Sequence, residues 1–186
     1  MAFFRHLHLG KSIARRYFVV NGFDGALTIL GIIVGFYVSQ SAEIHVIVNA
    51  CIGAAVALGI SGLSSAYISE QAERQKELNE LEQAMIRDLS DSQHERLARN
   101  IPIFVALVNG LSPFLISLLI LLPLFYADYL YGLAIDPLQT SIIIAFAILF
   151  LLGIFIGKIS QTFWLWSGIR TLLIALTTIA LIYIIT

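Results

Sequence analysis

Five apolar runs, each long enough to cross a lipid bilayer, dominate the sequence. They cover residues 17–39, 44–68, 101–126, 138–157 and 167–185. A helix needs about 20 apolar residues to span the hydrocarbon. Only 12% of the residues are charged, against about 25% in an ordinary soluble domain. The runs therefore predict an all-α integral membrane protein with five transmembrane helices, built as a single membrane domain over residues 1–186.

The basic residues are confined to three stretches. All eleven Lys and Arg residues lie within residues 1–16, 74–99 and 158–170. Basic residues that flank membrane spans stay on the cytosolic side. The distribution predicts a cytosolic N-terminus, an external C-terminus and an odd number of spans, which agrees with five. We expect a multi-pass protein of the cell (plasma) membrane with a retained N-terminal segment, and no nucleic-acid partner.

Asp24 is the most costly residue to place in a membrane. It lies seven residues into the first run, about 10 Å along a helix axis, and an Asp near the centre of a span costs about 3 kcal/mol. Asn21, Asp24 and Thr28 have the i, i+3, i+7 spacing that places three oxygen-bearing side chains on one helix face. Such hard ligands suit a small cation. The pattern favours an ion or proton path, and a polar seam between helices is the alternative.

Further polar residues occur inside the second and third runs. Ser61 and Ser64 lie near the predicted cytosolic end of the second, and Asn109 lies in the third. Their side chains could line a water-filled pathway or simply make hydrogen bonds between helices. The sequence leaves both interpretations open.

One stretch, residues 69–100, has the composition of a water-soluble helix and is predicted to be a cytosolic acidic helical segment. Its candidate metal ligands are four glutamates spaced by three or four residues and a later carboxylate-x-x-His pair: Glu70, Glu73, Glu77, Glu80, Asp91 and His94. Like charges this close repel each other, and a divalent cation would relieve the repulsion. The alternative is a solvated acidic face whose carboxylates pair with Arg74, Lys76 and Arg87.

Motifs of enzymes and pumps are missing from the sequence. It contains no phosphate-binding glycine-rich loop, no H-E-x-x-H and no G-x-S-x-G motif. Cys51 lies alone in an apolar run, where a packing role is the simplest interpretation. We therefore expect no enzymatic activity and no prosthetic group.

Several segments resemble the vacuolar iron transporter family. The segment Asn-Gly-Phe-Asp-Gly-Ala-Leu-Thr at residues 21–28 is similar to the family's first span, and residues 57–69 are similar to its second. Residues 152–158 and 167–173 resemble its C-terminal part. Gly62 and Ala66 stand where the family pattern has Met and Glu. The resemblance covers nearly the whole chain in the same order.

This resemblance implies a five-helix homodimer with a cytosolic metal-binding segment between the second and third spans. It implies that Fe²⁺ or Mn²⁺ leaves the cytosol in exchange for protons, with Asp24 as the transport carboxylate. The expected partners are a divalent metal ion, protons, membrane lipid and a second copy of the chain. The alternative is a membrane protein that does not transport but binds metal or a partner through its acidic helix. An intramembrane enzyme is the least favoured possibility.

Overall fold

The computed structural model describes the backbone of residues 2–39, 43–86 and 93–185, and their side chains except those of residues 2–13, 93–94 and 97–98. The regular elements of these ranges are all helices: α1 (Ala2–Ser39), α2 (Ile44–Met85), α3 (Gln93–Phe125), α4 (Ala127–Gly132), α5 (Pro137–Ile159) and α6 (Trp164–Ile185). Five of them, all but α4, contain a segment long and apolar enough to cross a membrane. The all-α prediction with five spans is confirmed, and the orientation in the membrane stays a prediction.

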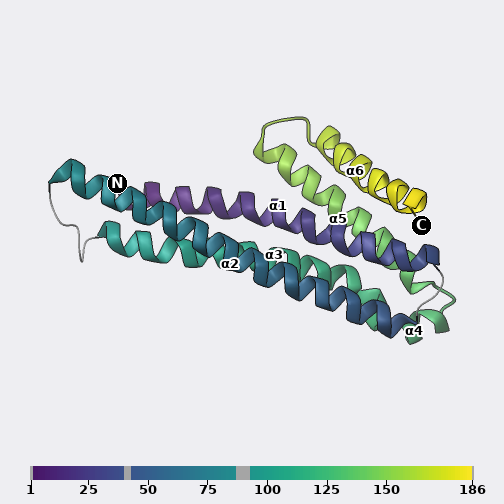
Figure 1. Ribbon diagram of the computed structural model, residues 1–186. Coiled ribbons are helices and arrows are strands. Elements are labelled where there is room, and N and C mark those ends of the chain that lie inside the picture. The colour runs from purple at the N-terminus through teal and green to yellow at the C-terminus, as the bar shows by residue number, and fades with distance from the viewer. Residues whose placement is uncertain (1, 40–42, 87–92, 186) are drawn as a thin grey trace.

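The helices form a three-helix layer with a helix pair beside it. Figure 1 shows α1, α2 and α3 running side by side over most of their lengths, while α5 and α6 form a hairpin next to α1. Five crossings place Ala2 and Ile185 at opposite ends of the bundle. We call the end that carries Arg15, Arg16 and Lys158 the basic end; it is the predicted cytosolic end.

The core lies where α1 meets α3 and α5. Ile29, Leu30 and Ile33 of α1 are fully buried against Ile120 of α3 and Leu149 of α5. This core consists of apolar side chains, so close packing rather than water exclusion must hold it together in a bilayer. Small residues at the contacts serve this packing.

Helix α2 is much longer than a membrane is thick. Its 42 residues correspond to about 63 Å at about 1.5 Å per residue, about twice the hydrocarbon thickness. The acidic residues occupy the second half, which extends beyond the apolar run of residues 44–68. The predicted acidic helical segment is therefore largely a continuation of α2, followed by the first turns of α3.

Gly25 marks a close backbone approach of α1 and α3. A Cβ atom added at Gly25 would lie 2.8 Å from both the Cα and the carbonyl oxygen of Pro113, which are backbone atoms that cannot swing aside. Pro113 lies inside α3. Gly25 therefore sets the distance between the two helices.

We expect Gly25→Ala to destabilise the chain by about 1–3 kcal/mol, the usual cost of overpacking. The matched control is Gly35→Ala on the same helix, because a Cβ at Gly35 meets nothing within 4 Å. The control should melt at the same temperature as the parent or slightly higher, since Ala is the better helix former. Thermal melting of the purified chain in detergent checks both. Equal melting temperatures for the two variants would refute the close contact.

Candidate ion pathway and acidic helix face

Asp24 lies on the surface of the chain, inside the membrane-length segment Ala14–Ser39 of α1. Its side chain is exposed, and within the described ranges no side chain forms a hydrogen bond or an ion pair with it. A carboxylate at this depth would face lipid at a cost of about 3 kcal/mol. The described part of the chain does not cover this position.

Asn21, one turn earlier on α1, lies in a different environment. Its Nδ2 donates to Oδ1 of Asn109 on α3, and also to the carbonyl oxygen of Tyr17 at 3.1 Å. Asn109 is buried, and its own Nδ2 donates to the carbonyl oxygen of Gly62 on α2 at 2.5 Å. The two asparagines thus join α1, α2 and α3. Two of the predicted pathway residues, Asn21 and Asn109, are therefore in direct contact.

A second polar link lies close by. The Ser112 hydroxyl of α3 donates to the carbonyl oxygen of Phe18 on α1 at 2.5 Å, and Ser112 is buried. A Cβ atom added at Gly22 would lie 2.9 Å from the same hydroxyl oxygen. The polar atoms around Asn21 are therefore used to hold helices together, whereas the carboxylate of Asp24 has no partner among the described side chains.

The remaining predicted pathway residues lie on outer faces. Thr28, one turn beyond Asp24 on α1, is half-buried. Ser61 and Ser64 are exposed on α2, so they do not join the buried group around Asn109.

Gly62 and Ala66 face α3 and are buried. A Cβ added at Gly62 would lie 3.1 Å from the carbonyl oxygen of Asn109. That carbonyl lacks its usual helical partner four residues on, because Pro113 has no N–H. The positions where the family pattern has Met and Glu are thus occupied in this chain by small residues that let α2 pack closely on α3.

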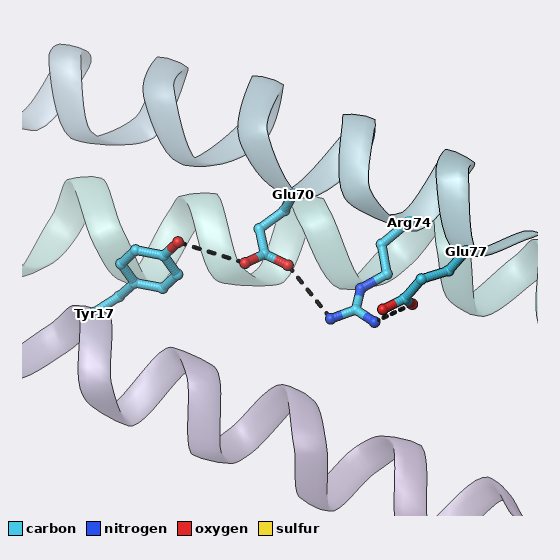
Figure 2. Close-up of polar contacts among 4 residues, drawn as sticks. All are labelled: Tyr17, Glu70, Arg74 and Glu77. Atoms are coloured by element: carbon cyan, nitrogen blue, oxygen red, sulfur yellow. Dashed lines mark hydrogen bonds and ion pairs between the residues drawn. The ribbon is translucent and has the colours of Figure 1, made fainter.

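Arg74 is the central residue of the acidic helix face. Figure 2 shows its guanidinium between Glu70 and Glu77 of the same helix. Arg74 Nη1 lies 2.6 Å from Glu77 Oε2, and Nη2 lies 3.5 Å from Glu70 Oε2. The Tyr17 hydroxyl of α1 donates to Glu70 Oε1 at 3.5 Å. The side chains of Arg74 and Glu70 are only 9% and 11% exposed, so this ion pair is nearly withdrawn from solvent.

The other predicted metal ligands are more dispersed. Glu73 and Glu80 are exposed, and Glu80 lies 3.9 Å from Lys76 Nζ. Asp91 and the side chain of His94 lie outside the described residues. In the described part of the chain, no three His, Cys, Asp or Glu side chains come together as a metal site. The positive charge beside Glu70 and Glu77 is the guanidinium of Arg74, which forms ion pairs with both carboxylates.

Two contributions were not visible from spacing alone. Nothing in the spacing of the charged residues pointed to Tyr17, yet its hydroxyl donates to a carboxylate 53 positions away. Arg74 was considered only as one of three surface cations, yet it is the most buried of those described. The helical register of Glu70, Arg74 and Glu77, at i, i+4 and i+7, is the signal that could have suggested the double ion pair.

These features define a class, that of polytopic helical membrane proteins with an ionisable residue inside a span. Comparison with known proteins narrows this class. Residues 79–186 match the model of the VIT family. The chain is also 33% identical over 173 residues to an uncharacterized protein of Methanocaldococcus jannaschii, covering 91% of this chain and 87% of that protein. The chain belongs to the VIT family. No solved structure matches it significantly.

Family membership indicates metal or ion transport across a membrane. The match begins in the acidic half of α2 and continues through α6, so it does not include Asp24. The similarity to the archaeal protein extends over most of the chain.

Proposed function

We propose that the chain exports a divalent metal cation, Fe²⁺ or Mn²⁺, from the cytosol across the cell membrane in exchange for protons, as a homodimer. The observation that carries the proposal is the exposed, unpartnered carboxylate of Asp24 inside a membrane-spanning segment. Ionisable residues at such depth mark ion or proton paths in most membrane proteins. The VIT family match supports the same class of function.

A second copy of the chain supplies the cover that Asp24 needs. If α1 packs against its symmetry mate, two Asp24 carboxylates face each other and provide oxygen ligands of opposite charge to a divalent cation. Thr28, one turn from Asp24 on α1, and the exposed hydroxyls of Ser61 and Ser64 on α2 are further oxygen ligands that the proposed path could use. Carboxylate and hydroxyl oxygens suit Fe²⁺ and Mn²⁺ better than soft ligands would. Protonation of the two carboxylates from the outer side then releases the metal.

On the cytosolic side, the acidic face of α2 gathers the cation. Glu73, Glu77 and Glu80 are exposed there, while Arg74 occupies the space between Glu70 and Glu77. An incoming cation therefore competes with Arg74 for Glu77, which keeps capture weak and reversible. Weak capture suits a transporter, because a tightly held ion would not be passed on.

A second candidate function is metal or partner binding without transport. One observation favours it: Glu73 and Glu80 are exposed on the part of α2 that extends beyond its apolar run. This candidate predicts binding at the acidic face with no movement of ions across the membrane.

Flux measurements on the purified chain in proteoliposomes distinguish the two functions. The vesicles enclose an acidic lumen and a pH-sensitive dye, and Mn²⁺ is added outside, with Zn²⁺ and Ca²⁺ in parallel. We expect Mn²⁺ uptake above that of protein-free vesicles, with a simultaneous rise in luminal pH. Uptake without a pH change would exclude proton exchange. Metal binding in equilibrium dialysis with no uptake would establish the second candidate instead.

A further inference from the structure

A cavity of about 310 Å³ lies between α1 and α5 at the basic end, on the far side of α1 from α2. Figure 1 shows the turn between α5 and α6 standing away from α1 at this level. The two helices meet at Gly22, where an added Cβ would lie 3.7 Å from Leu152, and the cavity opens beyond that contact. Its volume is within the range of about 300–1,000 Å³ that is usual for ligand sites.

The cavity has a mostly apolar lining with two cationic side chains. Val20 of α1 and Ile156 and Ile159 of α5 line it together with Arg15 and Arg16. Among the described residues that line it there is no carboxylate. Among the described side chains neither arginine forms an ion pair; the guanidinium of Arg16 lies 5.6 Å from the ring centre of Tyr17, which holds it in place. The positive charge is therefore available to an anion.

The position of the cavity identifies the kind of anion. Arg15 and Arg16 stand where α1 enters its apolar run, and Ser160 stands where α5 ends, so this part of the cavity lies at the level of the lipid headgroups. Guanidinium groups recognise phosphate with paired hydrogen bonds. The apolar lining below them can contact an acyl chain. A water-soluble anion has no such chain and would leave this lining uncovered. Basic pockets between membrane helices on the cytosolic side are known sites for anionic lipids.

We propose that this cavity binds an anionic phospholipid of the cytosolic leaflet, with its phosphate at Arg15 and Arg16 and one acyl chain against Ile156 and Ile159. The bound lipid fills the space between α1 and α5 and connects the α5–α6 pair to the three-helix layer at the basic end. The inference does not depend on which ion the chain transports.

Native mass spectrometry of the full chain in detergent tests the site, with palmitoyl-oleoyl phosphatidylglycerol as the probe. The parent chain should bind one such lipid per protomer, and palmitoyl-oleoyl phosphatidylcholine more weakly. The Arg15→Gln/Arg16→Gln variant should bind phosphatidylglycerol about 10- to 30-fold more weakly, because each basic residue at a lipid surface contributes about fivefold. The matched control is Lys158→Gln/Arg170→Gln, which removes the same charge near the same end but does not line the cavity. Its affinity should match that of the parent.

A third variant keeps the charges and fills the cavity. Ile159→Trp should also weaken phosphatidylglycerol binding, and it answers the question even if the arginine variant folds poorly. Equal losses in the control and the arginine variant would overturn the proposal, since they would indicate general attraction. Unchanged binding in Ile159→Trp would overturn it too, as would displacement of the lipid by an equal concentration of glycerol 3-phosphate, which has no acyl chains.

Discussion

Replacing Arg74 by Gln will destabilise the basic-end part of the bundle by about 3 kcal/mol, the lower end of what removing one partner of a buried ion pair costs. Arg74 lies between Glu70 and Glu77, and its loss leaves the carboxylate of Glu70, which is 11% exposed, without a positive partner. Only the Tyr17 hydroxyl would then remain to stabilise that charge. We expect a lower melting temperature in detergent and faster proteolysis of residues 69–85.

The matched control lies two residues away. Lys76 forms an ion pair with Glu80 at 3.9 Å, but both side chains are 66% exposed, and pairs of this kind contribute about 0–1 kcal/mol. Lys76→Gln should therefore change the free energy of unfolding by no more than about 1 kcal/mol. Its melting temperature should stay close to that of the parent. If the two variants melt together, Arg74 does not hold a buried pair.

Adding Glu70→Gln to Arg74→Gln separates the loss of attraction from the cost of a buried charge. A neutral amide needs only hydrogen bonds, so the double variant should recover part of the lost stability. The difference from the sum of the single changes measures the coupling between the two residues. Double and single variants of equal stability would show that Glu70 is solvated once Arg74 is gone.

The pair also bears on metal capture. Because Arg74 is a cation already held between two carboxylates, it occupies the place that spacing alone assigns to a metal ion. Four glutamates on one helix face predict strong mutual repulsion. Arg74 lies on the same face and pairs with two of them. The repulsion that would favour a metal is thereby partly relieved within the chain.

Hydropathy and basic residues predicted the five membrane helices because a bilayer imposes a minimum helix length and the basic residues separate the two sides. The short helix α4 was not predicted, since its six residues carry no periodic signal. The exposed position of Ser61 and the buried one of Asn109 could not be predicted either. Nothing in the local sequence states which neighbour a polar side chain in a span will face.

Contacts between distant residues account for the remaining differences. Asn21 and Asn109 are 88 positions apart, and Tyr17 and Glu70 are 53 apart. The spacing of Asn21 and Asp24 on α1 predicted a shared polar face, but the side chain of Asn21 is drawn to α3 by Asn109. Asp24 has no such partner on α3. The different environments of Asn21 and Asp24 therefore result from the packing of three helices and not from their spacing on α1.

We expect Asp24→Asn to abolish the proposed proton-coupled metal flux while leaving the fold intact. The substitution keeps the size of the side chain and removes its charge, so a divalent cation loses an attraction of about 4 kcal/mol for each unit of charge at a distance of about 4 Å. Flux should fall at least about 100-fold, which corresponds to about 2.7 kcal/mol. An uncharged amide costs less to place in a membrane than a carboxylate, so the melting temperature should not fall. A loss of transport would then reflect the ion path and not unfolding.

Two variants complete this experiment. Asp24→Glu keeps the carboxylate and should retain part of the flux. Asp128→Asn makes the same chemical change at an exposed position on α4, at the far end of the bundle, and should transport like the parent.

The most direct measurement is therefore the initial rate of Mn²⁺ uptake into acidic proteoliposomes for the parent chain and for Asp24→Asn, at equal amounts of reconstituted protein. If the Asp24 carboxylate carries the ion, the parent chain takes up Mn²⁺. Vesicles with Asp24→Asn then take up no more Mn²⁺ than protein-free vesicles. Equal rates for the two chains would show that the metal crosses the membrane without Asp24.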